Sequence, residues 1–432
     1  MSRVYEMYSH YKESGIEWIG KIPEEWEISR IKKLFKKKKI VEKKHAHTNI
    51  LSLSYGKLIV KNKEDNKGLL PNNYDTYQSV DVDNIIFRFT DLQNDKKSLR
   101  VGIAETSGII TSAYLCIYGN QNINMKFAYY FFHNMDLLKE FYNMGNGIRQ
   151  SLDFNDLKNS IFILPNLDEQ KRIAEYLDKK CEQAENFILK QENYIELLKE
   201  QKKALINHAV TKGIDPDVEL KESSIEWLGQ IPMHWEVKKL KYLVKEKLKY
   251  GANESADLDD VNLPRYIRIT DFGDNGKLKD ETFKSLPLKI AKEYYLNEGD
   301  ILFARSGATV GKTFQFKNFN GKACFAGYLI KVTPSKKILS DYLYNFTKSY
   351  SYEEWKNSIF NKATIENIGA DKYNMLDIIV PSLEEQQKIV EYIEKKVGII
   401  DLAISKAQEE IKLTREYLES LIYQAVTGQI RV

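Results

Sequence analysis

The chain has 432 residues, of which 43% are hydrophobic and 29% charged, and its formal net charge is +4. This composition is typical of a soluble protein, and the length is sufficient for two or three domains. No apolar run is long enough for a transmembrane helix, and the N-terminal segment lacks the apolar core of a secretory signal. The isolated Cys116, Cys181 and Cys324 argue against a disulfide framework and a structural zinc site, and favour a reducing cytoplasm.

The first recognisable feature is a short marker sequence, KESGIEWIGKIPEEWE at residues 12–27, which returns as KESSIEWLGQIPMHWE at 221–236. A basic cluster follows each copy. Such clusters at equivalent places are expected of a protein that grips a polyanion twice, although a solvated helix face gives the same pattern. The cluster residues are Arg30, Lys32, Lys33, Lys36, Lys37, Lys38, Lys39, Lys43 and Lys44 after the first marker, and Lys238, Lys239, Lys241, Lys245, Lys247 and Lys249 after the second.

The middle segments, about 37–160 and 245–376, are predicted to be mixed α/β. Short apolar runs at 84–89 and 300–305 are typical of strands. Aromatic-rich runs at 125–132 and 339–346 are typical of helices. Core packing is the usual role of such rings, and a minority at the surface could contact bases or sugars.

A long helix is predicted after each middle segment. Residues 163–214 align without a gap to 379–430, a shift of 216 positions, so the chain is a tandem repeat. Capping signals stand at Asn166 with Glu169 and at Ser382 with Glu385, and Gly213 and Gly428 mark the ends. Apolar residues recur at alternating steps of four and three, the pattern of a coiled-coil seam. The predicted seam contains Leu177, Ile188, Ile195, Leu198 and Leu205 in the first helix, and Ile393, Ile400, Ile404, Ile411, Leu418 and Leu421 in the second.

The two seams differ in their polar positions, which include Gln191, Lys202 and Thr414. Unlike but complementary seams favour an antiparallel pair within one chain, each helix being roughly 63 Å long at 1.5 Å per residue. Packing of each helix on its own domain, or an oligomer interface, are the alternatives. The predicted fold is mixed α/β, with two globular domains separated by two long antiparallel helices that form an intrachain coiled coil with pseudo-twofold symmetry. The predicted domains are residues 1–160, the central helix 163–214, residues 215–376 and the C-terminal helix 379–430.

Common catalytic motifs are missing from the sequence. It has no Gly-rich nucleotide fingerprint after a strand, no HExxH, no GxSxG and no convincing set of metal ligands. Residues 307–313 imitate a phosphate loop, but their spacing is one residue short and the following segment is predicted to be a strand. His45 and His47 are best explained as part of a polar loop.

The markers, the helix start PxLxEQxxIxEYxxKK and the segment GDILFARSGATVGKT at 299–313 together resemble the DNA specificity subunit of type I restriction-modification systems. The resemblance implies that two recognition domains each read one half of a split DNA target. It also implies two copies of an adenine methyltransferase subunit as partners, and an optional restriction subunit. S-adenosylmethionine would belong to the methyltransferase, ATP and Mg²⁺ to the restriction subunit, and this chain would not be an enzyme.

Candidate DNA contacts follow from side-chain chemistry, because arginine suits bidentate contact with guanine and lysine suits phosphates. In the first domain they are Lys57, Arg88, Lys96, Lys97, Arg100, Arg149 and Gln150. In the second they are Arg265, Arg268, Arg305, Ser306, Lys312 and Lys362. The second domain has Ala-Arg-Ser-Gly at 304–307 where the first has Phe-Arg-Phe-Thr at 87–90, so the transfer of contacts between domains stays open.

Two readers on one side of B-DNA must sit about one helical turn, roughly 34–36 Å, apart, and a stiff helical spacer would fix that interval. Because the helices align without a gap while the middle segments differ, we expect an asymmetric target of two unlike elements with a fixed gap. Other hypotheses are a specificity half of a type II-like system, a nuclease with an unrecognised acidic site, and a coiled-coil adaptor unrelated to DNA.

Overall fold

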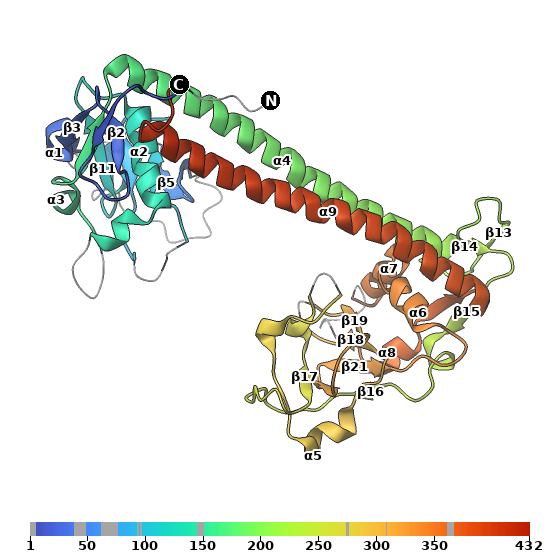
Figure 1. The fold of residues 1–432 in the computed structure, drawn as a ribbon. Helices are drawn as coiled ribbons and strands as arrows, with labels where there is room; N and C mark the ends of the chain where they lie inside the picture. The colour runs from blue at the N-terminus through green and yellow to red at the C-terminus, as the bar shows by residue number, and fades with distance from the viewer. Residues whose placement is uncertain are drawn as a thin grey trace. The chain divides into compact units, whose positions relative to one another are not determined.

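The computed structural model describes residues 6–38, 49–61, 77–92, 95, 97–144, 151–273, 276–307, 309–360 and 367–432. The chain divides into two compact units: unit 1 comprises Met1–Gln191 and Glu409–Val432, and unit 2 comprises Glu192–Gln408. Each unit contains one mixed α/β lobe and a part of each of the two long helices, α4 (Leu167–Lys212) and α9 (Leu383–Val426) (Figure 1). We call these the first lobe, residues 6–164, and the second lobe, residues 220–380.

The first lobe is built from short strands and helices. Its strands are β1 (Tyr11–Glu13), β2 (Lys21–Pro23), β3 (Glu27–Arg30), β4 (Phe35–Lys37), β5 (Leu51–Ser54), β6 (Lys57–Val60), β7 (Tyr77–Val80), β8 (Ile85–Phe87), β9 (Val101–Ile103), β10 (Gly108–Thr111), β11 (Leu115–Gly119) and β12 (Ile161–Leu164). Its helices are α1 (Ile31–Leu34), α2 (Met125–Leu137), η1 (Glu140–Asn143) and α3 (Phe154–Leu157). The predicted strand at 84–89 and helix at 125–132 correspond to β8 and α2.

The second lobe follows the same plan with different lengths. Its strands are β13 (Leu220–Glu222), β14 (Gln230–Pro232), β15 (Glu236–Lys239), β16 (Lys249–Tyr250), β17 (Arg265–Ile267), β18 (Ile301–Ala304), β19 (Thr313–Gln315), β20 (Ala323–Phe325), β21 (Leu329–Val332) and β22 (Asp377–Val380). Its helices are η2 (Leu240–Tyr242), η3 (Ile269–Asp271), η4 (Asp280–Thr282), α5 (Leu288–Ala291), η5 (Lys292–Tyr294), α6 (Ser340–Phe346), α7 (Tyr350–Phe360) and α8 (Ala370–Asn374). Strand β19 stands where a phosphate loop would require a helix, as the sequence predicted.

Each lobe is centred on a four-stranded sheet of the same topology. The strand order is β4-β11-β8-β9 in the first lobe and β16-β21-β18-β19 in the second. The central strands β8 and β18 are wholly buried apolar runs, because both of their faces are covered. The two lobes are therefore structural repeats, although their sequences hardly align.

The marker sequence and the long-helix start bind each other in both units. The indole Nε1 of the buried Trp26 donates to Glu169 over 3.1 Å, and that of Trp235 donates to Glu385 over 3.1 Å. The next residue of each helix, Gln170 or Gln386, accepts a hydrogen bond from a backbone amide of its lobe, over 2.9 Å and 2.8 Å. These paired contacts fix each lobe to the start of a long helix, which explains why both motifs occur twice.

The predicted helix caps and ends are confirmed. Asn166 caps the amide of Glu169, and Ser382 forms a capping box with Glu385. Gly213 and Gly428 follow the ends of α4 and α9 with φ of +83° and +71°. A Cβ on Gly428 would lie 3.1 Å from Trp26, and one on Gly213 would lie 3.3 Å from Trp235, so a marker tryptophan packs over each helix end.

The predicted antiparallel pairing of the long helices is confirmed within each unit (Figure 1). In unit 1, Gln191 donates to Glu410 over 2.9 Å; in unit 2, Lys202 donates to Asp401 over 2.7 Å. The residue number rises along α4 while that of its partner falls along α9, as antiparallel helices require. The polar positions of one seam thus find polar partners on the other helix.

The burial of the helices follows the seven-residue pattern. All of the predicted seam residues are buried or half-buried, whereas most of their sequence neighbours are exposed. Leu177 and Leu421 join the core of unit 1, and Ile393 joins that of unit 2 together with Leu205 at its margin. The seam therefore continues into the hydrophobic core of each lobe.

Candidate nucleic-acid interface

The strongest candidate site in each lobe is the loop that follows the buried central strand of the sheet. In the first lobe this loop joins β8 to β9, and in the second it joins β18 to β19. Backbone hydrogen bonds give the register: the amide of Arg88 donates to Arg100 over 2.8 Å, and that of Ala304 donates to Lys312 over 2.9 Å. Arg88 therefore corresponds to Ala304, and Arg100 to Lys312.

Arg305 occupies a different position from Arg88. Its carbonyl oxygen accepts from Ile368 over 2.8 Å, as that of Phe89 accepts from Leu152 over 3.2 Å, so Arg305 corresponds to Phe89. Successive residues of an extended chain point to opposite faces. The two arginines are thus one position apart, and a contact made by one cannot simply be transferred to the other.

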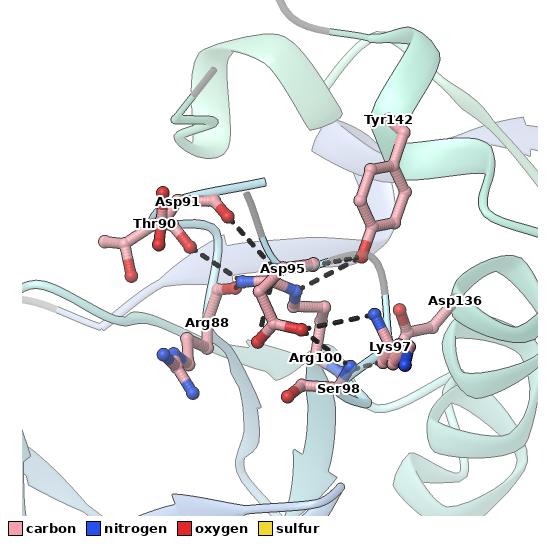
Figure 2. Close-up of polar contacts among 9 residues, drawn as sticks. All are labelled: Arg88, Thr90, Asp91, Asp95, Lys97, Ser98, Arg100, Asp136 and Tyr142. Atoms are coloured by element: carbon pink, nitrogen blue, oxygen red, sulfur yellow. Dashed lines mark hydrogen bonds and ion pairs between the residues drawn. The ribbon is translucent and has the colours of Figure 1, made fainter. Parts of the chain in front are cut away.

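Arg88 directly follows the central strand β8, and Arg305 directly follows β18. The guanidinium groups of these two arginines make no hydrogen bond or ion pair to any described residue. Arg88 is half-buried, and its guanidinium points away from the neighbouring polar cluster (Figure 2). Arg305 stacks on Tyr250, with 4.9 Å from its guanidinium carbon to the ring centre, and its buried Nε atom lacks a partner. A buried donor without an acceptor is costly, and an external acceptor would remove that cost. Both residues stay predicted DNA contacts.

The structure contradicts a direct DNA contact by Arg100. Its side chain is fully buried, and its guanidinium donates to backbone carbonyl oxygens of the β8–β9 loop, as Figure 2 shows. Asp95 lies beside it, with 3.8 Å between Arg100 Nη2 and Asp95 Oδ2. Hydrogen bonds from the hydroxyl and amide of Ser98 lower the pKa of Asp95 to about 2, so this carboxylate stays charged beside the guanidinium.

Two arginines of the second lobe also serve the fold. The side chain of Arg265 is only 5% exposed; it donates to the carbonyl oxygen of Lys279 and packs on Phe283. Arg268 is paired with Asp271 at 2.9 Å and is partly exposed. The structure therefore argues against the prediction that Arg265 reads DNA, because its side chain is buried in the lobe.

Lys57 lies in a setting that does not suit a phosphate. Its amino group is paired with Glu185 of α4 at 2.7 Å. It lines a cavity of about 780 Å³ between the β5–β6 hairpin, α2 and the long helices of unit 1, whose other lining residues include the carboxylates of Asp83, Glu105, Asp178 and Glu182. Because these charges repel a polyanion, the structure argues against the predicted contact.

The remaining candidates have these positions. Lys97 is exposed on the β8–β9 loop. Ser306 is half-buried and forms an isolated bridge with Asn367, and the Lys312 amino group lies 3.5 Å from the carbonyl oxygen of Phe272. Lys96, Arg149, Gln150 and Lys362 lie outside the described residues, as do Lys39, Lys43, Lys44, His45 and His47.

The two basic clusters are electrostatically unequal. In the first, Lys38 pairs with Asp81, whereas Arg30 and Lys32 donate to the uncharged Asn159. In the second, carboxylates pair with several members, namely Glu236 with Lys238, Asp377 with Lys239 and Glu246 with Lys249. The first cluster therefore keeps more of its positive field, and the duplication alone does not predict two equal phosphate-binding faces.

Comparison with known proteins gives the family. A family model described as "Type I restriction modification DNA specificity domain" matches residues 23–197 and 232–413. The chain belongs to the type I DNA specificity family. It is 25% identical to the type I restriction enzyme MjaVIII specificity subunit of Methanocaldococcus jannaschii, over 98% of this chain and 97% of that one.

Solved structures agree on the fold of this specificity subunit. A chain from a study of the assembly and conformational transition of a type I restriction-modification system matches with a TM-score of 0.69 and 15% identity, over 94% of this chain and 98% of that chain. The HsdS subunit from Thermoanaerobacter tengcongensis matches with a TM-score of 0.52 and 16% identity, over 97% and 100%. Within the described residues, no helix is long and apolar enough to cross a membrane, and no cluster of three His, Cys, Asp or Glu side chains could hold a metal.

Proposed function

We propose that this specificity subunit reads a bipartite, asymmetric DNA target, with one half-site recognised by each lobe. The observation that carries the proposal is a pair of guanidinium groups, those of Arg88 and Arg305, which follow equivalent buried strands and make no hydrogen bond or ion pair to the described residues. A rigid sheet is a suitable support for a side chain that reads DNA bases, because it limits the directions that the side chain can take. Their one-residue offset favours two different half-sites.

We further propose that the long helices set the gap between half-sites and dock two methyltransferase subunits. Leu197 and Leu413 occupy equivalent positions of the repeat and are 63% and 52% exposed. Exposed apolar side chains grouped on one element often mark a protein interface. Others on these helices are Phe187, Leu189, Tyr194, Ile399, Leu402 and Tyr417.

In this proposal the chain supplies recognition and its partners supply the chemistry. S-adenosylmethionine would be bound by the methyltransferase, and ATP with Mg²⁺ by a restriction subunit where one is present. The test is to express the chain with its methyltransferase and map modified adenines in genomic DNA. A motif of two unlike elements with a constant gap supports the proposal, whereas a continuous motif contradicts it. Methyl transfer or cleavage by the purified chain alone, given S-adenosylmethionine and Mg²⁺, would favour an enzyme.

Substitution of Arg305 gives a local prediction. Arg305→Ala should weaken discrimination at one base pair of one half-site by about 1–3 kcal/mol, because a bidentate contact to a base edge is lost. Methylation rates on targets that differ only at single positions measure this effect. Arg305→Lys keeps the charge and serves as the matched control. An equal rate loss on every target would indicate that Arg305 contacts phosphate.

The docking surface gives a second prediction. Leu197→Lys and Leu413→Lys should each weaken the binding of one methyltransferase subunit, because each places a charge in an apolar contact. Native mass spectrometry should then show complexes with one methyltransferase for either single variant and free specificity subunit for the double variant. Lys199→Glu, an exposed change on α4 away from the apolar residues, is the control. Full occupancy in the double variant would contradict the proposed surface.

A further inference from the structure

We propose that Arg100 is a positioning residue for DNA recognition: its buried guanidinium holds the backbone of the β8–β9 loop so that Arg88 is directed at a base pair of the first half-site. This inference rests on the proposed function. It adds a role to a residue that, being fully buried, cannot read DNA itself.

The guanidinium of Arg100 holds the loop through backbone atoms. Nη1 donates to the carbonyl oxygens of Arg88 (3.3 Å) and Thr90 (2.7 Å), and Nη2 donates to those of Asp91 (3.2 Å) and Asp95. All of these oxygens belong to the loop that begins at the end of β8 (Figure 2). One side chain therefore holds four carbonyl groups of this loop, those of residues 88, 90, 91 and 95.

Arg88 is held on both sides of its backbone. Its amide donates to the carbonyl oxygen of Arg100 over 2.8 Å, while its own carbonyl oxygen accepts from Arg100 Nη1. Its guanidinium, by contrast, points away from this cluster in Figure 2 and makes no hydrogen bond or ion pair to the described residues. A side chain without a polar partner among the described residues thus extends from a backbone that is hydrogen-bonded on both sides.

Arginine suits this role for a chemical reason. It offers five donors in a fixed plane, whereas lysine offers three on a flexible stem and methionine offers none. Its third donor position is used too, since Nε lies 3.4 Å from the hydroxyl of Tyr142, which itself donates to the Asp95 carbonyl oxygen over 3.0 Å. Asp136 of α2 accepts from the Arg100 amide, which links the arrangement to the helix behind the sheet.

The second lobe restrains the equivalent loop, between β18 and β19, in a different way. Its loop is shorter and closes through its own backbone, with Val310 donating to Gly307 over 3.0 Å and Gly311 donating to Ala304 over 2.8 Å. Gly307 and Gly311 both have φ of +82°, a conformation that favours glycine. Lys312 stands at the position of Arg100. The longer loop of the first lobe lacks these glycines and takes its restraint from a side chain, so the effect should be confined to the first half-site.

The test uses the full chain assembled with its methyltransferase and a library of targets randomised in both half-sites. The variants are Arg88→Ala, Arg100→Met, Arg100→Lys and the double variant Arg88→Ala with Arg100→Met. Arg172→Met, an exposed arginine of α4 in the same unit, is the matched control. Methylated adenines are sequenced, and thermal unfolding is followed for each complex.

Arg88→Ala should lower discrimination at one position of one half-site about tenfold or more. Arg100→Met should relax that same position to a similar extent, and the double variant should lose little further, because both changes remove one interaction. Arg100→Lys should retain part of the preference. The other half-site should keep its full preference in every variant.

Three results would overturn the inference: an unchanged preference at that position in Arg100→Met, an equal rate loss on all sequences, or full additivity in the double variant. Should Arg100→Met fail to assemble, the same criteria apply to Arg100→Lys. Failure of the proposed function is distinguished by exchange of the whole first lobe, which tests half-site reading without depending on Arg100. A lobe exchange that switches the half-site, with no effect of Arg100→Met, would refute this inference alone.

Discussion

Exchange of residues 37–160 for the matching segment of another type I specificity subunit should change one half of the methylated sequence and leave the other half intact. The physical reason is that the β8–β9 loop lies within this segment, together with the strands β8, β9 and β11 of the sheet that supports it. The second lobe has its own sheet and its own cores. Each mismatched base pair costs about 1–3 kcal/mol, so a changed half-site should be clear in the methylation pattern.

The structure also shows how to make this exchange without unfolding unit 1. Phe35 lies before the exchanged segment, yet its ring packs on Phe132 inside the segment and on Phe162 after it, at 5.4 Å and 5.2 Å between ring centres. A donor with an aromatic residue at the position of Phe132 preserves this cluster. Exchange of residues 245–376 is the matched control and should change only the other half. Changes in both halves from one exchange would refute modular reading.

Lengthening both long helices by one heptad should widen the gap between half-sites and leave the half-sites themselves unchanged. A heptad adds about 10 Å to a helix, which corresponds to about three base pairs of B-DNA. The insertions belong after Gln191 in α4 and before Glu409 in α9, between the helix portions of the two units. Unit 1 then keeps the pair Gln191 and Glu410, and unit 2 keeps the pair Lys202 and Asp401.

The seven-residue length matters because it returns the inserted helix to the same seam register. Insertion of a heptad into α4 alone is the control; it displaces the partners of one helix and should abolish assembly rather than change the gap. Mapping of modified adenines reports the gap directly. A constant gap in the doubly lengthened variant would show that something other than the helices sets the spacing.

Local sequence patterns predicted the helical part of this protein well. The seam, the caps at Asn166 and Ser382 and the ends at Gly213 and Gly428 all depend on residues within a few positions of one another. Even the antiparallel pairing could be inferred, because Gln191 and Lys202 interrupt one seam where the other lacks a polar residue. These features repeat with helical periodicity, and periodicity is visible in the sequence itself.

The candidate DNA contacts were much harder to predict, because charge alone does not say which way a side chain points. Arg88, Arg100 and Arg265 are the same residue type, yet the guanidinium of Arg88 makes no hydrogen bond or ion pair to the described residues, whereas Arg100 and Arg265 are buried. The distinction depends on carbonyl oxygens brought together by the folded loops, some of them far along the chain, such as that of Lys279 for Arg265. The spacing of residues in the sequence does not predict such contacts.

The sequence by itself thus determined the tandem repeat, the two long helices and their mutual orientation, together with the family resemblance that the comparison confirmed. Only the tertiary structure decided that the two lobes share one sheet topology, that Arg88 and Arg305 stand one position apart, and that Arg100 supports a loop. The reason is physical. Helix periodicity and caps arise from neighbours in sequence, whereas the direction and burial of a loop arginine depend on strand register and on acceptors supplied by distant segments.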